Sequence, residues 1–373
     1  MKPSSAPRAL LASLLLLLAL AQAGCAGLQP SSPAARSADP ALLHDTLFQP
    51  VAVPTAQALF ALSPAMQRYL AHEIAGQVRL RGAQDGLIDA LYTRSMLQLR
   101  YDPAATLTAQ EAFEQRHGNC LTLVIMTAAF AREMGLAVQY RRVHADTSYS
   151  RRGGLTLQSG HVNLGLGRVL AERRAGLEQD RWLVVDFLPA HEVRGHRSDE
   201  IDEATLVALF HVNRAADALA DGAIDTAYAH ARAAVTAAPG HAAAYNVLAV
   251  AYWRRGHLGL AEAALRAGHA LEPANTALLS NLTSVLRAAG REAEALVVAR
   301  QLAALEPYPP YHFFDLGMAA LNRDEPALAR DWFARELARD EEQAEVHFWM
   351  AVAQARLGDG RQARWHLAAA AER

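Results

Sequence analysis

The chain has 373 residues, of which 52% are hydrophobic and 20% are charged, and its formal net charge is −2. A chain of this length has room for two domains, each with its own hydrophobic core. The balanced charge, without a block of basic residues, gives no indication of nucleic-acid binding.

The N-terminus, MKPSSAPRALLASLLLLLALAQAGCAG, has the pattern of an export signal. Lys2 and Arg8 supply positive charge before an apolar run over residues 9–21, which is too short and wrongly flanked to remain in a membrane as a span. Small residues follow, and they are compatible with two routes of processing. In the first route, an ordinary signal peptidase recognises the A-x-A pattern at residues 21–23.

The second route follows from residues 20–25, which resemble the lipobox of bacterial lipoproteins. The resemblance implies that residues 1–24 are removed and that Cys25 is lipidated and becomes the first residue. Ala26 stands where lipoproteins retained in the inner membrane usually have aspartate, so the resemblance implies the periplasmic face of the outer membrane. Cys120 is the only other cysteine and then has no disulfide partner.

Residues 25–62 are rich in Pro, Ala and Ser and lack a sustained hydrophobic period, which predicts a tether between the membrane and the folded part. Helical patterns begin where this segment ends. Thr108 and Glu111 have the spacing of a capping box at the start of a short helix. The following run over residues 120–131 is apolar on all sides and ends shortly before Gly135, which predicts a buried helix with a glycine cap.

Three strand-like segments come after the predicted buried helix. AVQYRRV and RWLVVDFL are rich in strand-forming residues, and HVNLGLG between them alternates between apolar and other residues. Helices followed by strands predict an α+β domain over residues 63–200, in which an antiparallel sheet packs on the buried helix.

The last part of the chain repeats with a period of 34 residues. The glycines with this period are Gly222, Gly256, Gly290 and Gly358; the alanines are Ala227, Ala261, Ala295, Ala329 and Ala363; and the prolines are Pro239, Pro273 and Pro307. Within one unit, Tyr245, Leu248 and Tyr252 complete a pattern that resembles the tetratricopeptide repeat. The resemblance implies an all-α solenoid of about four to five units over residues 206–373, which binds a protein or peptide partner.

Cys120 stands at the start of the predicted buried helix, and Asn119 before it is a natural N-cap. The free N–H groups and the dipole at a helix start stabilise a thiolate, which is the nucleophilic form of cysteine. The position therefore suggests a reactive thiol. The alternative is an inert buried cysteine, which is common in protein cores.

A nucleophilic thiol needs a base, and the base needs a group that orients it. His161 opens the HVNLGLG stretch, and Asp186 lies in the apolar run that follows, where an aspartate is costly unless it is paired. An imidazole on a neighbouring strand could pair with it, although His161 could instead be an ordinary strand histidine. His117 and His144 are closer to the cysteine in sequence. However, His117 lies in the same turn as Cys120, and His144 lies in a loop-like segment, so neither is expected to act as the base.

The segment from Arg100 to Val143 is similar to the transglutaminase-like superfamily, whose fold is a rearranged relative of papain. The resemblance is carried by Tyr-Asp-Pro at 101–103, Arg-x-Gly-x-Cys at 116–120 and Arg-x-x-Gly-Leu at 132–136. It implies that Cys120, His161 and Asp186 form a catalytic triad. Asn163 departs from the pattern, because many members have an aromatic residue two places after the histidine.

Two classes of function follow from these features. The first is a cysteine-dependent enzyme of the cell envelope that acts on amide bonds, with the repeats recruiting a protein. The resemblance allows hydrolysis by a protease or amidase, which is favoured, and also acyl transfer between proteins. The second is a non-catalytic lipoprotein scaffold that assembles proteins through its repeats. No calcium-loop signature and no close cluster of metal ligands is found in the sequence, so neither a metal nor another cofactor is expected.

Overall fold

The structure is a computed structural model that describes residues 38–93, 96–152, 155–169, 182–188, 196–308, 311–341 and 343–372. The predicted export signal and Cys25 lie outside these residues. Among the residues that are described, no helix is both long enough and apolar enough to cross a membrane.

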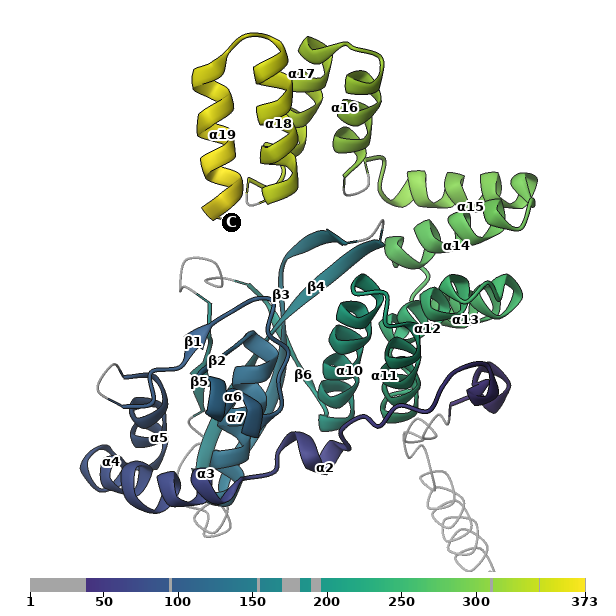
Figure 1. The fold of residues 1–373 in the computed structure, drawn as a ribbon. Coiled ribbons are helices and arrows are strands. Elements are labelled where there is room, and N and C mark those ends of the chain that lie inside the picture. The colour runs from purple at the N-terminus through teal and green to yellow at the C-terminus, as the bar shows by residue number, and fades with distance from the viewer. Residues whose placement is uncertain are drawn as a thin grey trace, which may run out of the picture. The chain divides into compact units, whose positions relative to one another are not determined.

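A series of helices leads into the sheet (Figure 1). They are α2 (Ala56–Leu59), α3 (Pro64–Tyr69), a π-helical turn η4 (Leu70–Ile74), α4 (Ala75–Arg81), α5 (Ala83–Tyr92), α6 (Ala109–Gln115) and α7 (Cys120–Glu133). The predicted capping box is present, because the Thr108 side chain accepts from the N–H of Glu111 while the Glu111 side chain accepts from the N–H of Thr108. Residues 121–131 of α7 are all buried, and Gly135 follows the helix with a φ of 72°. The predicted buried helix and its glycine cap are thus confirmed.

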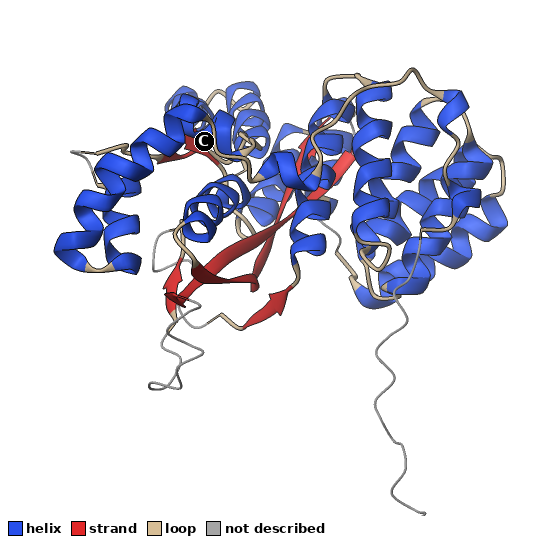
Figure 2. Ribbon diagram, turned by 90° about the horizontal axis from the view of Figure 1, so that it is seen from below, coloured by secondary structure: helices blue, strands red, loops and turns tan. Residues whose placement is uncertain are grey.

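Among the described residues, the main sheet has four antiparallel strands in the order β5-β4-β3-β6 (red in Figure 2). Its strands are β3 (Leu136–Arg152), β4 (Leu155–Val169), β5 (Leu183–Val185) and β6 (Ser198–Ile201). A short parallel pair, β1 (Arg100–Tyr101) and β2 (His117–Gly118), precedes α7. Side chains of β4 and α7 share one hydrophobic core, to which Val162, Leu164 and Leu166 belong. β4 is therefore held against the helix that begins at Cys120.

The strands differ from the sequence prediction in two respects. β3 and β4 extend past the predicted segments into a long hairpin, so the prediction that His144 lies in a loop is wrong: it is part of β3, and its imidazole bonds Asp199 at 2.7 Å. The sequence patterns do not predict β6. Its sequence, SDEI, contains mostly charged and polar residues, and it pairs along one edge of β3 where only part of it is covered.

In the described part of the chain, ten helices follow the sheet in five consecutive pairs. They are α10 (Glu203–Ala220), α11 (Ile224–Ala237), α12 (Ala242–Arg254), α13 (Leu258–Leu271), α14 (Thr276–Ala288), α15 (Glu292–Leu305), α16 (His312–Asn322), α17 (Pro326–Leu337), α18 (Ala344–Arg356) and α19 (Gly360–Glu372). The phased alanines are buried where the two helices of a pair approach each other. Each 34-residue period is thus one helix–turn–helix unit, as in a tetratricopeptide repeat.

The phased glycines occupy the turns inside the pairs, and each has a positive φ between 75° and 89°. The glycine period has a gap in the fourth unit, where Asp324 occupies the turn with a φ of 57°. Aspartate tolerates the left-handed conformation better than most residues, but glycine adopts it without steric cost.

Asp324→Gly is therefore expected to raise the free energy of unfolding by roughly 0.5 kcal/mol. The ion pair with Arg356 that would be lost spans 3.7 Å between exposed side chains, so its loss opposes the gain in stability only a little. The matched reverse change is Gly256→Asp, whose new Cβ would meet no atom within 4 Å. It should lower stability by a similar amount in urea denaturation, and equal stabilities for both variants and the wild type would contradict the backbone explanation.

Two buried histidine pairs occupy corresponding places in the first and fifth units. His211 and His230 approach through their Nδ1 atoms at 2.9 Å, and His347 and His366 do the same at 2.9 Å. Burial lowers the pKa of His211 to about 4 and, together with the neighbouring His211 and Arg214, lowers the pKa of His230 to about 3. The first pair is therefore neutral at pH 7, one ring donating to the other.

The prediction of a tether over residues 25–62 is wrong for its second half. Residues 38–49 pack on the hydrophobic core of the repeats, and Phe48 is a buried member of that core. Thr55 and Ser63 cap the helices α2 and α3 with their side chains. The composition of the segment concealed this packing, because a few apolar anchors separated by turns show no hydrophobic period.

Candidate active site at Cys120

Cys120 is the first residue of α7, and its thiol is partly exposed. Asn119 caps the helix as predicted, because its Oδ1 accepts from the N–H of Thr122 at 3.0 Å. The Asn119 amide group also donates to Thr106 Oγ1 at 2.8 Å, which ties the helix start to the preceding loop. The thiol is therefore held beside the N–H groups of the first helical turn, where a negative charge is favoured.

The turn before Cys120 is closely packed against Thr122, which is fully buried. Thr122 Oγ1 donates to Ala105 O at 3.0 Å and accepts from the N–H of Leu107 at 2.8 Å. A Cβ at Gly118 would lie only 2.2 Å from Thr122 Cγ2. Only glycine can therefore occupy position 118 while Thr122 holds the loop, and these contacts determine where the thiol stands.

The structure brings together His161, which lies within β4, and Asp186, which directly follows the neighbouring strand β5. β4 pairs with β5 so that Leu164 lies opposite Val185, and Asp186 follows directly. His161 Nε2 donates to Asp186 Oδ1 at 2.7 Å. The His161 side chain is only 7% exposed and that of Asp186 is 15% exposed, so this hydrogen bond is largely shielded from water.

Cys120 also lies close enough to His161 to raise the pKa of the imidazole through side-chain hydrogen bonding and through its charge. Because Nε2 is engaged by Asp186, Nδ1 is the ring nitrogen that remains for the thiol. The three residues that the sequence proposed as a triad are thus neighbours in the structure, in the order Cys120, His161, Asp186.

The pKa of His161 is raised from 6.5 to about 9. Burial acts in the opposite direction, but the hydrogen bonds and charges of Asp186 and Cys120 outweigh it. Because the folded-state pKa lies above the ordinary value, these interactions stabilise the fold fully below about pH 6.5 and lose this effect as the pH rises through about 9. The imidazolium form therefore predominates at neutral pH.

Asp186 is held by more than the histidine. Its Oδ2 accepts from Asn163 Nδ2 at 2.8 Å, and its Oδ1 also accepts from the N–H of Leu188 at 3.1 Å. Burial tends to raise the pKa of Asp186, but the hydrogen bonds from His161, Asn163 and Leu188 prevail and lower it. The carboxylate therefore stays ionised and is fixed on both oxygens.

Sequence reasoning did not identify this role of Asn163, which it noted only as a departure from the superfamily pattern. The signal was present: alternate residues of a strand point to the same side, so residues 161 and 163 can reach the same partner. Asn163 is 7% exposed, and its Oδ1 has no hydrogen-bond partner within the described part of the chain.

The two histidines nearest to Cys120 in sequence are not part of this arrangement. His117 Nδ1 donates to Gln115 O at 3.1 Å, and its Nε2 lies 3.7 Å from Asp102. His144 bonds Asp199 at the edge of the sheet. Among the residues that are described, no group of three or more His, Cys, Asp and Glu side chains could hold a metal ion.

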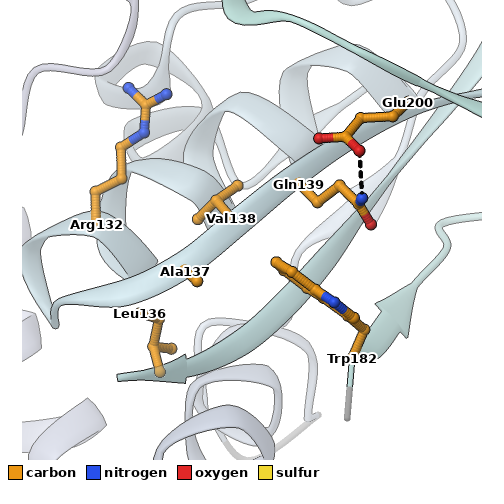
Figure 3. Close-up of a pocket in the computed structure, with 7 residues that line it drawn as sticks. All are labelled: Arg132, Leu136, Ala137, Val138, Gln139, Trp182 and Glu200. Atoms are coloured by element: carbon orange, nitrogen blue, oxygen red, sulfur yellow. Dashed lines mark hydrogen bonds between the residues drawn. The ribbon is translucent and has the colours of Figure 1, made fainter. Parts of the chain in front are cut away.

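An open hollow of about 620 Å³ lies elsewhere in the same domain (Figure 3). It is lined by Arg132, Leu136, Ala137, Val138, Gln139, Trp182 and Glu200, and Gln139 Nε2 donates to Glu200 at 2.6 Å. Trp182 lies over two glycines of β4, since a Cβ at Gly165 or Gly167 would come within 3.1 or 3.0 Å of the indole. None of the three residues at the Cys120 site lines this hollow.

No protein-family model matches the chain. No curated protein sequence matches it either. Some similarity is found to pilF of Pseudomonas aeruginosa, at 23% identity over 46% of this chain and 78% of that chain, with a TM-score of 0.32. YrrB, a TPR protein with an unusual peptide-binding site, is 20% identical over 44% of this chain and 85% of its own, with a TM-score of 0.26. TTC0263, a thermophilic TPR protein in Thermus thermophilus, is 20% identical over 41% of this chain and 89% of its own, with a TM-score of 0.31. All three identities are below 25%, so these structures say nothing about a substrate or partner of this chain.

Proposed function

We propose that the chain is a cysteine-dependent enzyme that acts on amide bonds, with Cys120 as nucleophile, His161 as base and Asp186 as the group that orients the base. One observation carries the proposal: the imidazole of His161 is bonded to Asp186 at 2.7 Å, and the thiol at the start of α7 lies close enough to raise the pKa of the same imidazole. The resemblance to transglutaminase-like enzymes, found in the sequence, supports the same assignment.

The arrangement suits acyl transfer through a covalent intermediate. The thiol proton is held by His161 as the imidazolium, and the thiolate sulfur of Cys120 forms a bond to the carbonyl carbon of the substrate amide. The C–N bond then breaks as the imidazolium gives its proton to the leaving nitrogen, which leaves a thioester on Cys120. Water attacks this thioester with His161 again acting as base, and the products are a carboxylic acid and the free thiol.

An activated ester that acylates reactive thiols tests the chemistry without knowledge of the natural substrate. The chain without residues 1–25 is incubated with p-nitrophenyl acetate, and acetylation of Cys120 is followed by release of p-nitrophenol and by mass spectrometry. We expect rapid acetylation of Cys120 followed by turnover. Cys120→Ala is the matched control and should give neither.

Acetylation of Cys120 at the rate of an ordinary exposed thiol, unchanged in His161→Ala, would contradict the proposal. Casein then serves as a general protein substrate. Loss of side-chain amide groups indicates deamidation, incorporation of an added amine indicates acyl transfer, and cleavage of the casein chain indicates proteolysis.

A scaffold without catalysis is the second candidate, and one observation favours it. Neither of two open hollows, one in the sheet domain and one beside α14, is lined by any of the three site residues. The repeats, by contrast, provide a long surface that extends from α10 to α19. In that case the repeats alone would bind and organise a protein partner. A Cys120→Ala variant that equals the wild type in partner binding and in complementing a deletion strain would favour the scaffold over the enzyme.

We also propose that Cys25 carries a lipid that anchors the chain at the periplasmic face of the outer membrane, as the lipobox-like sequence indicates. Cells grown with labelled palmitate should yield labelled wild-type protein, and Cys25→Ala should remove the label. Unlabelled wild-type protein beginning at residue 24 would instead identify ordinary cleavage after the A-x-A pattern.

A further inference from the structure

Residues 38–49, here called the strap, lie across the first helices of the repeats although they are far from them in sequence (Figure 1, dark purple). The strap contains two short 3-10 turns, η2 (Pro40–Leu42) and η3 (Asp45–Leu47). Its contacts connect it to α11, α12 and α13. The strap thus resembles a bound peptide that is covalently attached to its receptor.

An aromatic side chain anchors the strap. Phe48 is 7% exposed, and its ring stacks on Tyr228 of α11 with centroids 3.9 Å apart and planes 3° apart. Tyr252 of α12 packs on the same ring at 5.7 Å, and the Arg255 guanidinium lies 5.0 Å from its centre. Such a cluster of an aromatic anchor, two tyrosines and an arginine has the composition of a recognition hot spot.

A carboxylate three residues before the anchor makes the second specific contact. Asp45 Oδ1 accepts from the Tyr228 hydroxyl at 2.8 Å and is 2.9 Å from Arg232 Nε. Tyr228 therefore contacts both side chains of an Asp-x-x-Phe pattern, one through its ring and the other through its hydroxyl group. This double contact fixes the spacing of the two side chains.

The backbone of the strap is also recognised. The Tyr252 hydroxyl donates to Leu42 O at 2.7 Å and accepts from the N–H of His44 at 3.1 Å. At the other end, the N–H of Gln49 donates to Asp225 Oδ1 at 2.9 Å. The repeats therefore contact the main chain of the strap as well as the side chains of Asp45 and Phe48, as peptide-binding domains contact their ligands.

With the strap in place, Tyr228 is 4% exposed and Tyr252 is fully buried. Removal of the strap would leave both aromatic side chains open to water beside Arg232 and Arg255. Arg255 is paired with Asp225, whereas Arg232 faces the carboxylate of the strap. An aromatic patch beside such a cation attracts a segment that has both a carboxylate and an apolar side chain, and the strap has this chemistry.

We propose that α11, α12 and α13 form a recognition site for a short segment with a carboxylate three residues before an aromatic ring, which the strap occupies and which a partner protein's segment of the same chemistry displaces. The inference rests on the proposed role of the repeats in binding protein, and makes no use of Cys120. Because the strap is attached to its site, its effective concentration is high and a partner must compete against it.

The test measures binding of a fluorescein-labelled peptide of residues 38–50 to the chain without residues 1–25, by fluorescence anisotropy. Asp45→Ala/Phe48→Ala in the chain removes both anchors of the attached competitor, so this variant should bind the peptide at least tenfold more tightly than the wild type. Thr46→Ala, at an exposed strap position, is the matched control and should behave as the wild type. A peptide with both alanine changes should not bind.

A double variant that keeps its helical circular dichroism but binds no peptide would overturn the proposal and make the strap a fixed part of the fold. If the double variant does not fold, a protease site introduced at residues 50–55 allows the strap to be cut from a chain that has already folded. Uptake of the labelled peptide after cutting supports exchange, whereas a cut strap that stays bound against excess peptide overturns it. Alkylation of Cys120 reports separately on the proposed enzyme, so failure of one proposal is distinguishable from failure of the other.

Discussion

His161→Ala is expected to slow the alkylation of Cys120 by iodoacetamide about 100-fold at pH 6. In the wild type, the imidazolium stabilises the thiolate, and its pKa of about 9 means that it remains protonated across the neutral range. Without the imidazole, no neighbouring cation stabilises the thiolate, so the thiol should react as an unassisted cysteine. The rate of carbamidomethylation is measured by mass spectrometry from pH 5 to pH 9.

The pH profile separates the two cases more sharply than a single rate. The wild-type rate should vary only a few-fold between pH 6 and pH 9, while the His161→Ala rate should rise steeply toward pH 9. Asp186→Asn keeps the shape of the side chain but removes its charge, so we expect an intermediate loss of about tenfold at pH 6. His72→Ala, at an exposed position outside the site, serves as the control and should leave the profile unchanged.

Asn163→Ala tests the support of the carboxylate. The change removes the donor to Asp186 Oδ2 and should give a smaller loss than Asp186→Asn. If the alkylation rate of wild-type Cys120 depends on pH like that of an ordinary thiol, and none of these substitutions changes it, then the basis for the proposed catalysis is removed.

Gly118→Ala is the stability change with the largest expected effect, a loss of roughly 2–4 kcal/mol in the free energy of unfolding. The new methyl group would lie 2.2 Å from Thr122 Cγ2 and 2.7 Å from Thr122 Cβ, so the threonine must move. Moving it breaks the hydrogen bonds to Ala105 O and from the N–H of Leu107. Urea denaturation of the wild type and the variant measures the difference.

The matched control for this prediction is Gly160→Ala, since a Cβ there would meet no atom within 4 Å. It should change stability by less than about 0.5 kcal/mol. Thr122→Ala removes the clashing methyl group together with the hydroxyl, so Gly118→Ala/Thr122→Ala should cost less than the sum of the single changes. If the losses in the free energy of unfolding of the two single variants simply add in the double variant, or if Gly118→Ala alone costs less than about 1 kcal/mol, then the clash is relieved without moving Thr122 and the explanation is wrong.

The sequence by itself determined the features that depend on residues close together along the chain. The 34-residue period predicted the helix pairs, because alanine must recur wherever two helices approach closely and glycine wherever the turn needs a positive φ. The caps at Thr108, Asn119 and Gly135 were predictable for the same reason: each satisfies backbone groups within one turn of its own position. The apolar run after Cys120 predicted burial of α7, since no face of that helix could remain in water.

Only the tertiary structure decided the contacts between distant segments. The pairing of β4 with β5 brings Asn163 to Asp186, and no local pattern in WLVVDFL announces an amide partner. β6 is a strand because the edge of β3 supplies its hydrogen bonds, not because of its own residues. The strap bonds to helices 183 and 210 positions away, at Tyr228 and Tyr252. Such contacts depend on the complementary surfaces that folding creates, so composition alone described the strap as a tether.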